Sequence, residues 1–424
     1  MTEVELGALL REHAARTSVP GAAIGVLRGG ETVTAVTGVP DVETADPVAL
    51  ETRFAVGSLC KSWSRRRSRA SSRTVVSLDD PVSSRVPELE RAEWAARASV
   101  RDLLANRARV PLRAELEFPQ ASDDGDDALE HHVANVALAG PAEPYWSYSN
   151  LGWSVVGRVI AQATGRTWEQ AMREQLFEPL ELDETTFAPA EGLSCASGHD
   201  VVDGEVVRSA SWTPRALAPA GSTLLSTVTD LVRFAAAHVE TPSFAALRHD
   251  SQEIGIHGWL DAWCLGFARF DWEGGPVWGW DGLISGQRSV LRLVPELRGA
   301  VVLLTNSARG RALYRSLLPA VMGAWFGVRM PTLELRAFDC AAGDLSRFEG
   351  VYAWPDRHWD VTARASSLAL TSDDRTFDGL PIDERTFLID ADDPDTPTVT
   401  FAAFGDDGRP GVLYDMLWGL PRRG

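Results

Sequence analysis

A serine and a lysine stand three residues apart in this chain of 424 residues, and together they could form an activated nucleophile. The segment reads Ser58-Leu59-Cys60-Lys61, and Lys61 is the sole lysine among 41 basic residues. A position that keeps lysine in an arginine-rich chain needs a property that arginine lacks. Arginine stays protonated, whereas a buried lysine can lose its proton and act as a base. One helical turn would bring Ser58 and Lys61 together, the arrangement of an activated serine.

A second segment carries a hydroxyl and an amide that could serve the same site. Tyr148-Ser149-Asn150 lies in the aromatic-rich stretch PYWSYSNLGWSVVGRVIAQATG, where a turn opens a predicted helix. The tyrosine hydroxyl and the asparagine amide can therefore project from the helix start into a cleft. A structural explanation exists for each residue taken singly, with Ser58 and Asn150 as helix caps, Lys61 as a surface lysine and Tyr148 as a core aromatic.

The third segment is Gly279-Trp280-Asp281-Gly282, just before a predicted strand. Glycines there would let a backbone N–H group approach a substrate closely. In this order, the three segments resemble the penicillin-recognising serine hydrolases, which include class C β-lactamases, D,D-peptidases and esterases of the same fold. The resemblance covers residues 5–330 and is supported by matches at 77–81 (SLDDP), 177–187 (FEPLELDETTF) and 219–234 (PAGSTLLSTVTDLVRF).

The resemblance implies a reaction through an acyl-enzyme, with no metal and no organic cofactor. Ser58 is then the nucleophile, neutral Lys61 takes its proton, and Tyr148 protonates the leaving group. Asn150 orients Lys61 and the substrate. The backbone N–H groups of Ser58 and Leu283 form the oxyanion hole, which is usually the largest electrostatic contribution. The predicted substrate-binding residues are Asn150, Trp280, Asp281, Gly282 and Leu283.

One departure from the family pattern bears on the substrate. The third motif of the family usually begins with lysine or histidine, and Trp280 takes that place here. A cation would attract the carboxylate of a β-lactam or of a peptide C-terminus, whereas an indole would not. We therefore expect an esterase or amidase acting on a small uncharged acyl substrate, ahead of β-lactamase, D,D-peptidase or D-aminopeptidase activity. The structural alternative is that Trp280 only packs the floor of the site.

A second departure is the segment 62–76, which reads SWSRRRSRASSRTVV, with five arginines and no acid. The family has an apolar helix here, and burying unpaired arginines would cost several kcal/mol each. A frame error in the gene is the hypothesis we favour, because GC-rich codons for 63–76 read two bases later can give VAAALARxLVADGG. A basic interaction patch is an alternative. If the arginines are genuine, we expect a damaged helix and a catalytically impaired relative that acts as a binding protein.

The composition limits the classes of molecule that the protein is expected to bind. The net charge of −18 argues against nucleic acid and anionic membranes, so we expect a small-molecule ester, amide or peptide as partner; the sequence leaves the oligomeric state open. The N-terminus lacks the pattern of a signal peptide, and no apolar stretch approaches the roughly 20 residues of a membrane span. We therefore expect a cytoplasmic protein. The four cysteines show no metal-binding spacing, so we expect buried free thiols.

The predicted fold class is α/β (α+β). Strands at both ends of the region 1–330 indicate one antiparallel sheet flanked by helices, with a helical subdomain at about 85–270 and the active site between them. A small β-rich domain is expected at 337–424. The predicted helices span 4–17, 99–106, 127–139, 151–164, 167–177, 227–239 and 309–325, and the predicted strands span 22–28, 32–37, 286–294 and 299–305. We expect His199 to be a structural loop residue.

Overall fold

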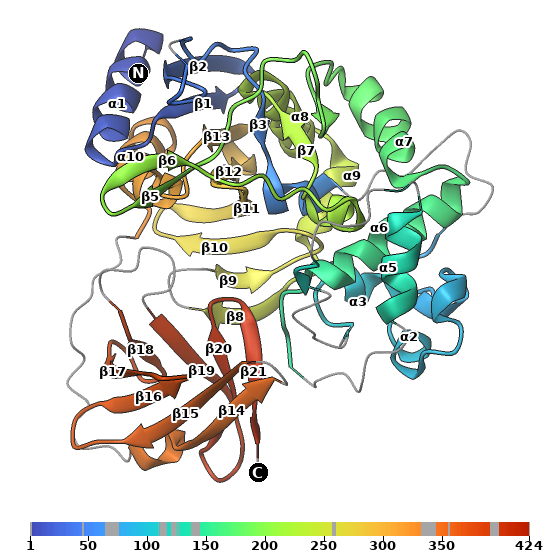
Figure 1. The fold of residues 1–424 in the computed structure, drawn as a ribbon, viewed down its shortest axis with the longest axis vertical. Coiled ribbons are helices and arrows are strands. Elements are labelled where there is room, and N and C mark those ends of the chain that lie inside the picture. Colours follow the sequence, from blue (N-terminus) through green and yellow to red (C-terminus); the bar gives the residue numbers. More distant parts are fainter. Residues whose placement is uncertain are drawn as a thin grey trace.

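The computed structural model contains a large sheet with helices on both faces, a helical region beside it, and a separate barrel formed by the C-terminal residues (Figure 1). The described residues are 2–44, 46–63, 76–108, 110, 117–119, 125, 127–136, 145–256, 260–331, 345–354, 357–390 and 398–423.

The large sheet is antiparallel and joins the two ends of the region 1–330. Its strand order is β2-β1-β13-β12-β11-β10-β9-β8. The bounds are β1 Gly21–Arg28, β2 Glu31–Gly38, β8 Gln252–Ile256, β9 Leu260–Trp263, β10 Ala268–Trp272, β11 Gly275–Ile284, β12 Gln287–Val294 and β13 Gly299–Thr305. Pairing of β1 with β13 places the N-terminal strands at one side of the sheet, with β2 at its edge.

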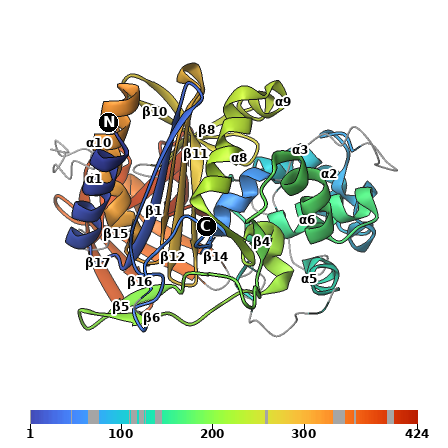
Figure 2. The same ribbon diagram turned by 90° about the horizontal axis from the view of Figure 1, so that it is seen from above.

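Helices cover both faces of this sheet (Figure 2). On one face lie α1 (Glu3–Arg16) and α10 (Gly310–Phe326), and on the other lies α8 (Val228–Glu240). Strands β12 and β13 are buried along their whole length. Burial on both faces explains the nearly continuous apolar sequence of β13, GAVVLLT, whereas β12, QRSVLRLV, also buries four polar residues.

The helical region lies beside the edge of the sheet and contributes α6 (Asn150–Thr164) to the site. Its other helices are α2 Glu93–Arg97, α3 Val100–Leu104, α5 Ala128–Val136 and α7 Trp168–Met172. Helix α6 begins at the N-cap Ser149 and ends at Gly165, which has the left-handed φ of 65° that a C-terminal glycine tolerates best. A three-stranded sheet of β3 (Phe54–Ala55), β7 (Leu224–Ser226) and β4 (Thr186–Phe187) links the two parts.

The C-terminal strands close into an eight-stranded barrel with a hydrophobic core of its own. The strands are β14 Gly350–Trp354, β15 Arg357–Ala363, β16 Leu368–Ser372, β17 Arg375–Pro381, β18 Thr386–Leu388, β19 Thr398–Phe404, β20 Pro410–Asp415 and β21 Trp418–Arg423. Closure removes the open sheet edges that would otherwise pair with other chains. Three barrel residues, Val412, Tyr414 and Leu417, pack instead into the core of the larger unit.

The antiparallel sheet, the helical region and the β-rich C-terminal part confirm the predicted fold class. The predicted helices and strands occur with ends shifted by a few residues, except that 137–139 of the helix predicted at 127–139 lie outside the described residues and α7 continues as a π-helical turn over Arg173–Phe177. The predicted helical insert at about 85–270 is wrong at its C-terminal end, where β8, β9 and β10 belong to the sheet. These strands are short, and two glycines adopt left-handed φ angles: Gly255 (66°) within β8 and Gly266 (89°) between β9 and β10. The breaks leave no long alternating run in the sequence.

The third motif precedes β12 as predicted, but it also lies within β11 (Gly275–Ile284), a strand that was not predicted. The predicted boundary between the two parts, near 331–343, falls almost wholly on residues outside the described ranges. Cys60, Cys195 and Cys264 are free thiols, and Cys195 is only partly buried; Cys340 lies outside the described residues. Among the helices that the structure describes, none has the length and apolar character needed to cross a bilayer.

Helix α8 contains a buried histidine that should make folding sensitive to acid. His238 is fully buried among Phe234, Phe244 and Phe267, and within the described part of the chain its ring nitrogens have no hydrogen-bond partner. Burial lowers its pKa well below 6.5, and the charge of Arg248 lowers it further. The unfolded chain therefore binds a proton that the folded chain rejects, so stability falls as pH drops below 6.5.

We predict that His238→Phe removes part of this acid sensitivity. Phenylalanine fits the aromatic cluster and takes up no proton. The native protein should lose up to about 1.4 kcal/mol more than the variant for each pH unit below 6.5. Denaturant unfolding at pH 7, 6 and 5 measures the difference, in which the contributions of all other titrating groups cancel. Parallel pH profiles for the two proteins would contradict the prediction.

Candidate active site

Ser58 and Lys61 lie in η1 (Gly57–Trp63), a short helix that starts directly after strand β3. Gly57 makes the turn between them with a left-handed φ of 59°, a conformation that favours glycine. A Cβ at this position would lie 2.8 Å from the backbone nitrogen of Leu283, so the glycine also allows β11 to approach closely. Ser58 is partly exposed, whereas Lys61 is 1% exposed.

The Lys61 amine has three oxygen neighbours. Nζ lies 3.1 Å from Ser58 Oγ, 2.9 Å from Asn150 Oδ1 and 2.8 Å from the carbonyl oxygen of Ala220. The two carbonyl oxygens can only accept hydrogen bonds, so a neutral amine gives its two protons to them. Its lone pair then faces the Ser58 hydroxyl, which is the direction a general base requires.

The environment of Lys61 also favours loss of its proton. Burial lowers the pKa of Lys61 to about 7, although the nearby charge of Glu117 opposes this shift. Desolvation penalises the ammonium because it loses its hydration in the protein interior. A large fraction of the Lys61 side chains is therefore neutral near pH 7, where an exposed lysine would be almost fully protonated.

Tyr148 and Asn150 reach the site from the start of helix α6. Ser149 caps the helix by accepting a hydrogen bond from the backbone N–H of Gly152 at 2.9 Å, which satisfies one of the free donors of the first turn. The Tyr148 ring lies 4.9 Å from Lys61 Nζ. Burial raises the pKa of Tyr148, while its hydrogen bonds to Ser58 and Trp280 oppose the rise. Tyr148 therefore remains a neutral phenol that can donate a proton.

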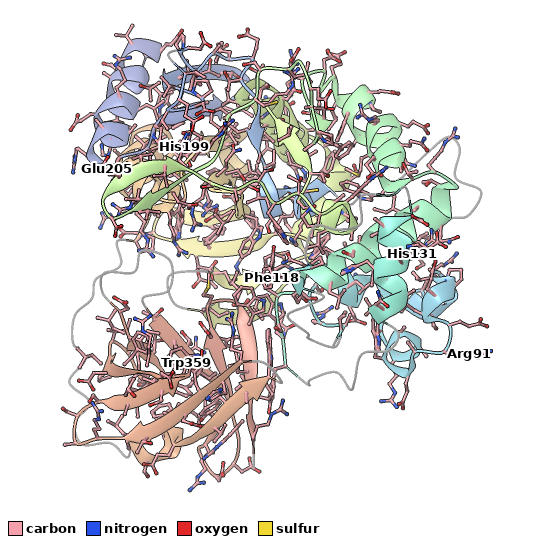
Figure 3. The ribbon with its side chains drawn as sticks, viewed as in Figure 1. Arg91, Phe118, His131, His199, Glu205 and Trp359 are labelled. Carbon is pink, nitrogen blue, oxygen red and sulfur yellow. The ribbon has the colours of Figure 1, made fainter. Side chains whose placement is uncertain are left out.

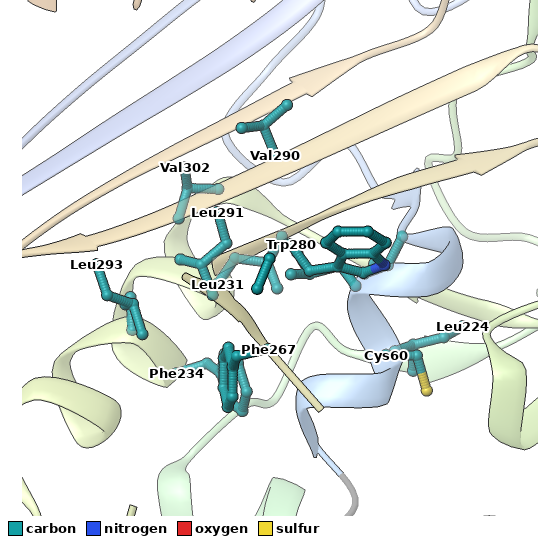
Figure 4. Packing of buried hydrophobic residues seen from close by; sticks show 14 of the residues in the cluster. Cys60, Leu224, Leu231, Phe234, Phe267, Trp280, Val290, Leu291, Leu293 and Val302 are labelled. Atoms are coloured by element: carbon teal, nitrogen blue, oxygen red, sulfur yellow. The ribbon is translucent and has the colours of Figure 1, made fainter. Parts of the chain in front are cut away.

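Trp280 supports Tyr148 from β11 and is itself buried, with 3% of its surface exposed. Its indole Nε1 donates a hydrogen bond to Tyr148 Oη at 3.2 Å, and the ring centroids are 5.5 Å apart. Figure 4 shows the indole beside the helix that carries Cys60. Because the indole can only donate, the phenol oxygen of Tyr148 accepts this hydrogen bond. The hydroxyl proton of Tyr148 is not used in it and can be donated to another group. A direct substrate contact by Trp280 stays a prediction.

We predict that Trp280→Phe lowers kcat by roughly 2- to 12-fold, the value of one neutral hydrogen bond. Phenylalanine keeps an aromatic ring against Tyr148 but loses the Nε1–H donor. The expected change is in kcat rather than KM, because the lost contact fixes a proton donor and not the substrate. Steady-state kinetics on a single ester substrate measure it. A change confined to KM would instead assign Trp280 to substrate binding.

Strand β11 presents a free backbone N–H at Leu283. The two-residue turn Ser285-Gly286, with φ of 47° and 68°, pairs Ile284 with Gln287. Hydrogen-bonded and non-hydrogen-bonded pairs alternate along an antiparallel ladder, so the Leu283 N–H points away from β12. It faces Gly57 and the start of η1, as an oxyanion-hole donor must, while the Leu283 side chain is 49% exposed.

Two more residues of the third motif, Asp281 and Gly282, shape this strand. A Cβ on Gly282 would lie 2.0 Å from the carbonyl oxygen of Val56, so only glycine lets β11 pass this close to the segment before η1. Asp281 forms an ion pair with the buried Arg292 at 2.6 Å. Burial opposes the charge of Arg292, yet the Asp281 carboxylate raises the pKa of Arg292. The Asp281 carboxylate and the Arg292 guanidinium therefore neutralise each other within the protein.

Sequence reasoning missed two contributions to the site. The barrel reaches it through the turn after β20, where the Leu417 carbonyl accepts a hydrogen bond from the Tyr148 backbone N–H at 3.1 Å. The Phe118 ring lies 5.8 Å from that of Trp418 and 6.4 Å from that of Trp212, and Figure 3 shows Phe118 between the sheet and the barrel. No short sequence motif marks contacts between such distant segments.

The second missed contribution is Glu117, a buried carboxylate that accepts hydrogen bonds from the first residues of α6. The sequence around it, AELEFPQ, holds a second acid at Glu115, so nothing there marked Glu117 as a site residue. Residues 64–75, which hold the arginine-rich segment, lie outside the described residues. Within the described ranges, no group of three His, Cys, Asp or Glu side chains could hold a metal ion. His199 is buried and hydrogen-bonds to the backbone of Val42 and Asn306, consistent with a structural role.

Comparisons with known proteins agree with this geometry. The family model described as Beta-lactamase matches residues 6–321. The chain is 29% identical over 370 residues to penicillin-binding protein 4 of Amycolatopsis lactamdurans, covering 81% of this chain and 95% of that protein. The crystal structure of SurE superposes with a TM-score of 0.78 and 26% identity over 99% of both chains. A D-amino acid amidase of Ochrobactrum anthropi SV3, complexed with L-phenylalanine amide, has a similar fold, with a TM-score of 0.62, 24% identity, and coverage of 75% of this chain and 98% of its own.

Proposed function

This chain belongs to the Beta-lactamase family of serine hydrolases, and from that premise we propose that it hydrolyses small uncharged esters or amides through an acyl-enzyme on Ser58. The observation that carries the proposal is the arrangement around Lys61. A buried amine with a pKa near 7 directs its lone pair at the Ser58 hydroxyl, and two carbonyl oxygens hold it there.

The proposed reaction runs in two steps. Lys61 takes the Ser58 proton as Oγ attacks the substrate carbonyl carbon, and the backbone N–H groups of Ser58 and Leu283 stabilise the resulting oxyanion. The bond to the leaving group then breaks while Tyr148 donates its proton to that group and regains one from Lys61. In the second step, water gives a proton to Lys61 and attacks the acyl-enzyme, and Lys61 returns that proton to Ser58 Oγ as the acid is released.

The proposed preference for an uncharged acyl group rests on the lack of an unpaired cation among the described residues at the third motif. Trp280 supplies no cation, and the guanidinium of Arg292 is paired with Asp281. Among the described residues at the site, Lys61 is the one basic side chain at the nucleophile, and it is needed as a base. Solved structures of relatives include SurE with D-Leu and the D-amino acid amidase with L-phenylalanine amide, which favours amino-acid esters and amides as first substrates to test.

One panel of substrates distinguishes the proposed function from two alternatives. Purified protein and Ser58→Ala would be assayed with p-nitrophenyl acetate and butyrate, D- and L-phenylalanine amide, and nitrocefin. We expect ester or amide hydrolysis that Ser58→Ala abolishes, with nitrocefin the poorest substrate. Nitrocefin as the best substrate would favour a β-lactamase or D,D-peptidase. No turnover of any substrate by folded protein would favour a catalytically impaired binding protein.

A further inference from the structure

Glu117 is a buried carboxylate that binds the first turn of helix α6. It is 1% exposed. One carboxylate oxygen accepts a hydrogen bond from Ser149 Oγ at 2.5 Å, and the other accepts from the backbone N–H groups of Asn150 at 2.6 Å and Leu151 at 3.3 Å. With the Ser149 cap on Gly152, three backbone donors of this turn are satisfied, two of them by Glu117.

This contact leads directly to the proposed catalytic base. The Asn150 residue whose backbone binds Glu117 uses its side-chain oxygen to accept a hydrogen bond from Lys61 Nζ at 2.9 Å. Nζ in turn lies 3.1 Å from Ser58 Oγ. Two hydrogen bonds and one residue therefore separate the Glu117 carboxylate from the amine that faces the nucleophile.

Glu117 and Lys61 also interact through their charges. Burial raises the pKa of Glu117 to about 7, against the hydrogen bonds from Ser149, Asn150 and Leu151 and the charge of Lys61. The other titratable neighbours of Lys61 stay neutral, because burial raises the pKa of Cys60 to about 12 and raises that of Tyr148 as well. Near pH 7, Glu117 and Lys61 are therefore the two groups around the nucleophile that change charge.

We propose that Glu117 is a positioning residue for the serine hydrolase reaction. Its carboxylate holds the first turn of α6 so that Asn150 aims the Lys61 amine at Ser58, and its negative charge sets how readily Lys61 gives up its proton. The inference rests on the proposed function for its catalytic consequence. Its electrostatic consequence can be measured without any substrate.

Because Lys61 is the sole lysine of the chain, lysine labelled with ¹³C at Cε gives one NMR signal from a protein carrying a lysine-free tag. That signal reports the titration of Lys61 without assignment. In native protein we expect a midpoint near pH 7. In Glu117→Gln, loss of a nearby negative charge should move the midpoint to lower pH by about half a unit or more.

Glutamine can preserve the hydrogen bonds of Glu117, with its oxygen facing the backbone N–H groups of Asn150 and Leu151 and its NH₂ group facing Ser149 Oγ. Glu117→Gln should therefore keep kcat within a few-fold of native and shift the acidic limb of the rate profile with the Lys61 midpoint. Glu117→Ala leaves these buried donors without a partner. It should lower kcat by about 100-fold, as displacement of a catalytic group does.

The matched control is Glu88→Gln, which removes a half-buried carboxylate that binds Arg158 on the same helix α6, away from the site. It should leave the Lys61 midpoint unchanged. If the Lys61 midpoint in Glu117→Gln equals the midpoint in native protein and in the control, the electrostatic part of the proposal is overturned. Native kcat in a folded Glu117→Ala would overturn the positioning part. A shifted midpoint in protein that hydrolyses no substrate would leave this inference standing and contradict the proposed function instead.

Discussion

Replacing Lys61 with arginine is expected to lower kcat/KM for ester hydrolysis by about 10³-fold or more, within the range of losing a general base. Arginine keeps the positive charge and the hydrogen bonds to Asn150 and Ala220, but its guanidinium stays protonated and has no lone pair for the Ser58 proton. The loss should appear in acylation, measured as the rate of reaction with a fluorophosphonate.

The pH dependence of the native protein checks the same claim. Lys61 must be neutral to act, and burial lowers its pKa to about 7. Activity should therefore rise with pH through about 7 and level off above it, since deprotonation converts the inactive ammonium to the active amine. The Lys61→Arg variant should show no such limb in its residual rate.

The control for this variant is Arg28→Lys, an exchange of the same two residue types at an exposed strand end. It should keep native kinetics. Thermal unfolding of both variants checks that Lys61→Arg is folded, because the larger guanidinium enters a buried position. Native-like labelling by folded Lys61→Arg would rule out Lys61 as the base.

The second large effect is expected for Tyr148→Phe, which should lower kcat by about 10²- to 10³-fold for amide substrates. The change removes the phenol that Trp280 holds at 3.2 Å and leaves an aromatic ring in its place. Since burial raises the pKa of Tyr148, the hydroxyl acts as a proton donor over the whole assay range rather than as a phenolate.

The leaving group distinguishes this role from a structural one. An amide must receive a proton as its bond breaks, whereas p-nitrophenolate leaves without one. Tyr148→Phe should therefore slow amide hydrolysis much more than p-nitrophenyl ester hydrolysis. Equal losses for the two substrates, or a loss that follows the melting temperature, would assign Tyr148 to packing alone.

Much of this fold could be predicted because its elements have clear local patterns. Strand β13 was predicted with its observed ends, since an apolar run bounded by turn residues marks a strand buried on both faces. Strands β8 to β10 could not be predicted in the same way, because each is short and glycines with left-handed φ break the pattern. Their assignment depends on pairing with β11, which is a tertiary contact.

The site residues likewise fall into those whose contacts are local in the sequence and those whose contacts join distant segments. Ser58 and Lys61 are one helical turn apart, so sequence spacing alone indicated their contact. The contact of Glu117 with Asn150 joins separate segments and left no motif. The predicted roles of the site residues, the oxyanion hole and the cytoplasmic location stay predictions that the structure does not test. The frame-error hypothesis falls on residues 64–75, outside the described part, and resequencing the gene would decide it.

Intact-protein mass spectrometry before and after treatment with a fluorophosphonate tests the central claim most directly. The starting mass shows whether the chain with its arginine-rich segment is the one produced. Our account predicts one adduct on the native protein and none on Ser58→Ala, with Lys61→Arg labelled far more slowly. An adduct that persists in Ser58→Ala, or none on folded native protein, would contradict Ser58 as an activated nucleophile.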